Sequence, residues 1–133
     1  MFSHGSFDAR RRPWDAGRVS TDLDTLRDAW SVERSRIVQQ IADLEHRFND
    51  IVDAAELTST DDEHDPEGAT IAYERAQVSA LLRHARADLF AIDEASELLN
   101  AGRALHCSEC GAPIPVERLL ALPGTRTCVS CAR

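Results

Sequence analysis

Apolar residues recur at helical spacing along two long segments of the chain. From Ile37 onward in the first segment the intervals alternate between four and three residues, and in the second segment most positions repeat every seven. This spacing describes a heptad seam, which is typical of helices that pair along their length. The positions are Leu23, Leu26, Trp30, Ile37, Ile41, Leu44, Phe48, Ile51 and Ala55, then Ile71, Val78, Leu82, Ala85, Leu89, Ile92 and Leu99.

Polar residues and punctuating residues predict where the two helices begin and end. The N-cap of the first helix can be Ser20, Thr21 or Asp22. Asp65 can cap the second helix, with Pro66 as its first helical residue, a position where proline loses no hydrogen bond. Asn100 and Gly102 supply a stop signal.

Two heptad segments joined by a short polar connection predict a mainly α protein, an antiparallel coiled-coil hairpin over residues 20–104 with its tip at 59–68. The alternative is that the helices pack against other subunits. The short connection favours pairing within one chain, so we expect a monomer. Arg34 stands where the seam should continue, which predicts an imperfect register there. Residues 1–19 mix Gly, Pro, Ser and Arg without periodicity and are predicted to be a flexible tail.

Composition and charge narrow the classes of partner. Aromatic residues make up only 5 % of the 133 residues, which favours an elongated helical shape over a large layered core. The net charge of −8 argues against a nucleic-acid partner held by phosphate contacts. We find no apolar stretch long enough for a membrane span and no signal-peptide pattern, so we expect a cytoplasmic protein.

Four cysteines form two CxxC pairs, Cys107 with Cys110 and Cys128 with Cys131. This spacing predicts a C4 zinc finger over residues 105–133, in which four thiolates form a closed, structural Zn²⁺ site. The competing interpretations are a redox CxxC motif, two disulfides or an iron–sulfur centre. A redox motif favours a βαβ context, which is absent, and a cytosolic setting favours metal ligands over disulfides. Because so small a module holds little core, we expect chelation to unfold residues 105–131 while most helicity remains.

The connection between the helices is strongly acidic. The stretch TSTDDEHDPEGAT, residues 58–70, carries five carboxylates and no Arg or Lys. Such a turn can be a solvated cap, a cation site or a contact surface. The chain shows no GxSxG, HExxH or P-loop pattern. A thin hairpin also provides no concave setting for an acid–base pair, so we expect no enzyme activity.

A long helical hairpin, an acidic tip and the segment CSECGAPIPVERLLALPGTRTCVSC together resemble the DksA/TraR family of bacterial transcription regulators. The resemblance covers roughly residues 25–131. It implies a protein that binds RNA polymerase without direct contact with nucleic acid. In this family the hairpin enters the secondary channel of the polymerase, and residues at the tip act near the catalytic Mg²⁺.

The resemblance also assigns roles to the tip. Family members carry an Asp-x-x-Asp-x-Ala motif there. Ala69 matches the family's Ala, Glu67 stands at the second Asp and His64 stands at the first. The residues expected to contact the polymerase are therefore Asp61, Asp62, Asp65, Glu67 and Ala69.

The predicted second helix lacks the basic residues that accompany a ppGpp response in this family. Members that respond to the alarmone ppGpp present basic residues there, whereas residues 87–99 read ADLFAIDEASELL and contain none. A phosphate-rich ligand needs cations, so we expect little or no ppGpp dependence.

Two other functions fit the sequence less well. One is a coiled-coil and zinc-finger adaptor for a different protein partner. The other is a nucleic-acid-binding zinc ribbon, although Arg118 and Arg126 against Glu117 provide too little positive charge between the cysteine pairs.

Overall fold

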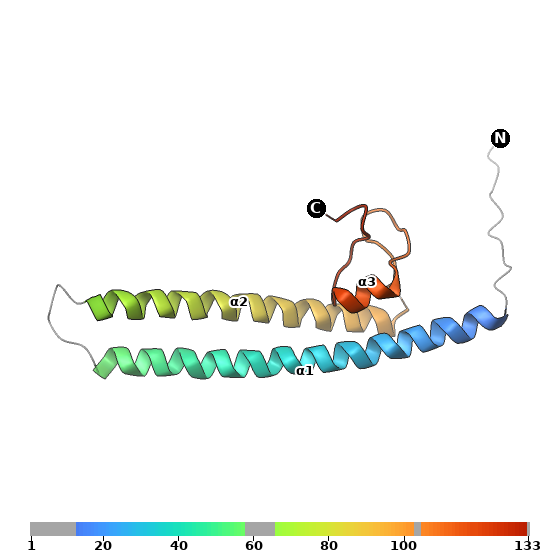
Figure 1. Ribbon diagram of the computed structural model, residues 1–133. Helices are drawn as coiled ribbons and strands as arrows, with labels where there is room; N and C mark the ends of the chain where they lie inside the picture. The colour runs from blue at the N-terminus through green and yellow to red at the C-terminus, as the bar shows by residue number, and fades with distance from the viewer. Residues whose placement is uncertain (1–12, 58–65, 103–104, 133) are drawn as a thin grey trace.

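The computed structural model describes residues 13–57, 66–102 and 105–132. Helix α1 runs Pro13–Leu57, helix α2 runs Pro66–Asn100, and a short helix α3 runs Val116–Ala121. Figure 1 shows α1 and α2 lying side by side, with α3 and its flanking loops over the end where α2 finishes. At about 1.5 Å per residue, the 35 residues of α2 span about 52 Å. The predicted antiparallel hairpin with a C-terminal finger is confirmed.

The ends of α2 lie where the sequence predicts them. The helix begins at Pro66 and ends at Asn100. The Ala101 N–H donates to the Glu97 carbonyl at 3.0 Å, and Gly102 follows with φ of +72°. Glycine reaches this left-handed conformation without the steric cost that a Cβ imposes. A glycine just past the last helical residue thus ends α2 as expected.

The start of α1 corrects one prediction. The helix begins at Pro13 rather than at Ser20, so residues 13–19 belong to the helix and not to a tail. Proline at the first helical position already has a helical φ, and its missing N–H would have no partner there in any case. Gly17 lies inside α1, where a glycine costs about 1 kcal/mol relative to Ala.

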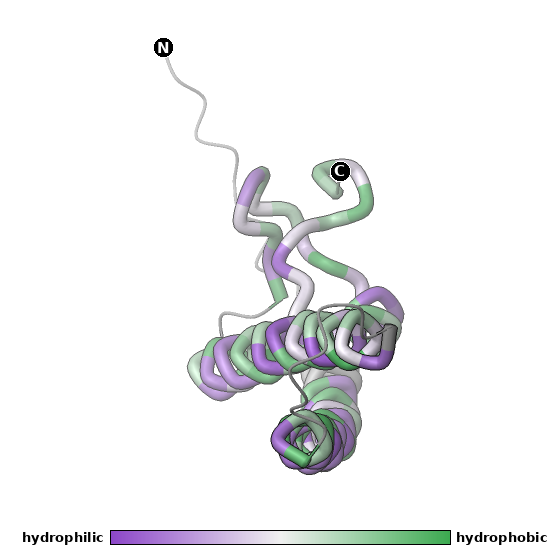
Figure 2. The backbone as a smooth tube through the Cα atoms, turned by 90° about the vertical axis from the view of Figure 1, so that its left-hand side faces the viewer, coloured by the Kyte–Doolittle hydropathy of each residue, from purple (hydrophilic) through white to green (hydrophobic). Residues whose placement is uncertain are grey.

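The core follows the predicted heptad positions and divides into two clusters. The cluster at the base of the hairpin includes Leu26, Trp30 and Ile37 from α1 and Ile92 and Leu99 from α2, together with finger residues. The distal cluster contains Leu44, Ile51, Val78, Leu82 and Ala85. Figure 2, which views the hairpin from its closed end, shows polar and apolar residues mixed around both helices. No helix of the described residues is long and apolar enough to cross a membrane.

Arg34, the polar residue in the seam, reaches across to the other helix. Its Nε donates to Asp93 Oδ1 at 2.7 Å. Arg27 donates to the Asn100 side chain at 3.2 Å, again from α1 to α2. Farther along, Arg86 on α2 pairs with Glu45 on α1 at 2.7 Å. The register therefore continues through Arg34, and polar contacts at the edge of the interface replace the missing apolar one.

Candidate metal centre

Each CxxC pair folds into a tight turn that brings its two sulfurs to the same side. In the first turn, the Gly111 N–H donates to the Cys107 carbonyl at 2.9 Å, and Gly111 adopts φ of +74°. In the second, the Cys131 N–H donates to the Cys128 carbonyl at 3.2 Å. The Ser108 N–H also donates to the Arg126 carbonyl at 2.8 Å, which ties one turn to the other.

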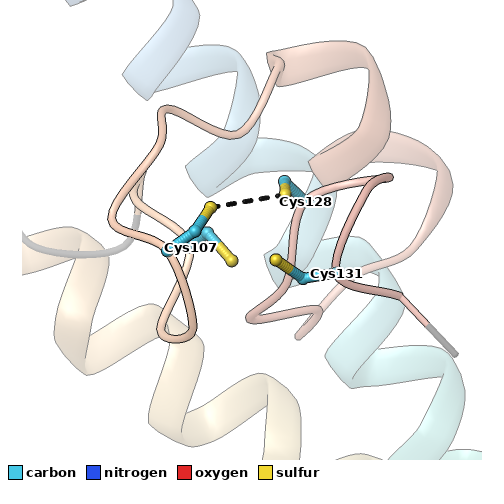
Figure 3. A group of neighbouring side chains, drawn as sticks. Cys107, Cys128 and Cys131 are labelled. Atoms are coloured by element: carbon cyan, nitrogen blue, oxygen red, sulfur yellow. Dashed lines mark hydrogen bonds between the residues drawn. The ribbon is translucent and has the colours of Figure 1, made fainter.

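The four sulfurs converge on one point. All four Sγ atoms lie within 4.8 Å of one another, and Cys110 Sγ is 3.7 Å from Cys128 Sγ. Figure 3 shows the side chains of Cys107, Cys128 and Cys131 turned toward a shared centre. A tetrahedral ion with Zn–S bonds of about 2.3 Å requires sulfurs about 3.8 Å apart. The donor set and its spacing therefore fit one Zn²⁺, and all four cysteines are free thiols rather than disulfide partners.

The pKa values of the cysteine thiols also favour a bound cation. Backbone N–H groups, those of Cys110 and Cys128 foremost, lower the pKa of Cys107 to about 6. Interaction with the neighbouring thiols, Cys128 foremost, raises the pKa of Cys131 to about 12. One thiolate is thus stabilised in advance, but four cannot coexist without a positive charge. A bound Zn²⁺ supplies that charge, and its closed shell of four sulfurs leaves no position for a substrate.

The finger is built around α3 and rests on the hairpin. Leu119 on α3 is wholly buried, and its carbonyl accepts a hydrogen bond of 3.2 Å from Trp30 Nε1 on α1. The Arg118 guanidinium donates to the Thr127 carbonyl at 2.9 Å and so braces the approach to the second CxxC turn. Sequence reasoning predicted neither α3 nor this role for Trp30. Two residues could have indicated α3 from the sequence: Pro115 directly before it and the acidic Glu117 in its first turn.

The predicted tip residues are partly within the described structure. Glu67 and Ala69 lie in the first turns of α2 and are exposed. They lie at the end of the hairpin opposite the finger (Figure 1). Asp61, Asp62 and Asp65 lie outside the described residues. The structure therefore brings the four cysteines together and places Glu67 and Ala69 far from them.

Taken together, fold and site define a protein with an antiparallel helical hairpin and a structural four-cysteine zinc finger. Residues 101–133 match the family model of the prokaryotic dksA/traR C4-type zinc finger. Over 83 % of its length, the chain also matches transcription factor DksA2 from Pseudomonas aeruginosa, covering 79 % of that chain with a TM-score of 0.68 and 28 % identity. The finger is thus of the dksA/traR C4 type, and the hairpin and finger together resemble the structure of DksA2.

A short part of the sequence also matches a curated protein. It is an uncharacterized protein of Haemophilus influenzae, 54 % identical over 39 residues, which make up 29 % of this chain. The chain spans about half of that relative, 49 % of its length.

Proposed function

We propose that this protein is a transcription regulator that binds RNA polymerase by inserting its hairpin into the secondary channel, without direct contact with DNA. The observation that carries the proposal is the extent of the match to transcription factor DksA2. A match over 83 % of the chain includes much of the hairpin as well as the finger. The family is one of regulators and not of enzymes.

The dimensions and charge of the hairpin support this mode of binding. Two paired helices form a stiff rod of about 50 Å, long enough to reach into a narrow channel. The net charge of −8 favours association with a basic opening. Exposed Glu67 at the leading end can pair there with Arg or Lys, or alter the environment of a nearby metal ion.

The finger forms the base of the rod, and its few basic residues argue against a contact with nucleic acid. Between its cysteine pairs the finger carries only Arg118 and Arg126 as basic residues, against Glu117, and Arg118 also donates to the Thr127 carbonyl. Phosphate contacts need a surplus of exposed cations. We therefore place the contact with the partner on protein surfaces and not on nucleic acid.

The surface of α2 near the finger supports independence from ppGpp. Over residues 87–99 the helix carries only acidic charges, those of Asp88, Asp93, Glu94 and Glu97. We expect the effect on transcription to be the same with and without ppGpp. A low-micromolar ppGpp site that forms only in the complex with polymerase would contradict this expectation.

Transcription in vitro tests the role of the tip. The variant Asp65→Asn/Glu67→Gln removes two charges at the tip, and Asp88→Asn/Glu94→Gln removes two on the same chain near the finger. We expect the first variant to bind polymerase but lose its effect on initiation, and the second to act like the wild type. If wild type and both variants leave initiation unchanged, the proposed function is wrong.

A further inference from the structure

The metal centre and the base of the hairpin share one hydrophobic core. Cys107 and Cys128, which are 4 % and 8 % exposed, belong to the same buried cluster as Leu26 and Trp30 of α1. Leu119 of the finger is wholly buried in this cluster. Two of the four side chains that would hold the zinc, Cys107 and Cys128, therefore belong to the core that holds the two long helices together.

The finger contacts each long helix directly. On α1, Trp30 is 2 % exposed and donates its indole N–H to the Leu119 carbonyl at 3.2 Å. On α2, the loop after α3 approaches so closely that a Cβ on Gly124 would lie 3.3 Å from three atoms of Ala91. The folded finger thus clamps both helices at the same end of the hairpin.

The other half of the hairpin is packed separately. Its cluster, which includes Leu44, Val78 and Leu82, contains no finger residue. Partly buried Ile41 packs against both clusters and marks the boundary between them. Loss of the finger would therefore remove packing from one side of Ile41 and leave the other side intact.

We propose that zinc binding orders the base of the hairpin as well as the finger, and that this effect ends near Ile41. Trp30 is the positioning residue that links the two. The proposal extends the expectation that chelation unfolds residues 105–131 while most helicity remains, and it does not rest on the proposed function.

The coupling must act in both directions. If zinc stabilises the base of the hairpin, an ordered base must raise zinc affinity by the same factor, so a substitution that disorders the base must weaken zinc binding. Leu26 and Leu82 provide a matched pair because both are buried leucines on the hairpin, 0 % and 7 % exposed. Only Leu26 belongs to the cluster that contains cysteines.

Hydrogen exchange of the full chain, with zinc and after chelation, tests the extent of the effect. On zinc removal we expect protection to fall in residues 23–37 and 92–100 as well as in the finger. Protection in residues 44–51 and 78–85 should persist. A loss confined to residues 105–131, or an equal loss along the whole of both helices, would each overturn the proposal.

Competition with a zinc chelator, on the same full chain, tests the reverse direction. We expect Leu26→Ala to weaken zinc affinity about tenfold, within the usual range for coupled sites, and Leu82→Ala to leave it unchanged. Trp30→Phe keeps an aromatic ring but removes the indole donor and part of the ring volume, so it serves as a milder second variant and should weaken zinc affinity measurably. If Trp30→Phe leaves zinc affinity unchanged, or if Leu82→Ala lowers it as much as Leu26→Ala does, the base and the metal are not coupled as proposed.

Discussion

Two adjacent leucines in α3 differ sharply in burial and allow a direct test of how the finger is held. Leu119 is wholly buried against the hairpin, whereas Leu120 is 38 % exposed. Truncation of each to Ala removes the same atoms from the same short helix. Alanine is a good helix former, so helix propensity does not account for a difference between the two variants.

The expected costs follow from these burials. Leu119→Ala removes a fully buried side chain and leaves a cavity, which costs about 2–5 kcal/mol. Leu120→Ala loses only part of the transfer free energy, about 1 kcal/mol. In a chain of this size 1 kcal/mol shifts Tm by about 4 °C. We therefore expect Leu119→Ala to lower Tm by about 8–20 °C and Leu120→Ala by about 4 °C.

Thermal unfolding followed by circular dichroism measures both variants. Free zinc must be held constant, because metal that binds only the folded state raises its apparent stability. Equal Tm shifts for the two variants would refute the placement of α3, since exposure could then not explain the costs.

Three further results are expected. A double-mutant cycle on Arg34→Ala and Asp93→Ala should show a small favourable coupling that fades at high salt, because both side chains are about half exposed. An absence of coupling at low salt would contradict a stabilising ion pair between α1 and α2. Gly124→Ala should lower Tm more than Gly111→Ala, since both have positive φ but only Gly124 also approaches α2; equal shifts would argue against the clamp. Zinc affinity, measured by chelator competition, should fall as pH falls, because Cys131, with its pKa raised to about 12, must lose its proton to bind the metal; an affinity independent of pH would contradict this.

The sequence predicts the hairpin well because its signals are local and periodic. Heptad positions such as Ile37 and Val78 are buried as expected, since the spacing of apolar residues alone decides which face of a helix is covered. Pro66 and Gly102 mark helix ends through their own backbone restrictions. The cysteine spacing predicts the metal ligands for a similar reason, because each CxxC turn is a local structure.

Contacts between distant segments are what sequence reasoning missed. The hydrogen bond from Trp30 to the Leu119 carbonyl joins residues 89 positions apart. Nothing in the heptad pattern distinguishes Trp30 from any other seam residue. The early start of α1 at Pro13 was missed because helical spacing of apolar residues is absent there.

The contact of Arg34 with the other helix was likewise not predictable from the sequence. The pattern identifies it as an interruption of the seam, but its partner Asp93 becomes apparent only once the two helices are aligned. The register of the hairpin thus explains a residue that the sequence alone presents as an irregularity.

Co-elution with RNA polymerase tests the central claim most directly. The zinc-loaded protein would be mixed with bacterial RNA polymerase and separated by size-exclusion chromatography. Binding predicts that the protein appears in the polymerase fractions, and that Asp65→Asn/Glu67→Gln appears there too. Elution of the wild-type protein entirely apart from polymerase, at concentrations of both in the micromolar range, would contradict the proposed function.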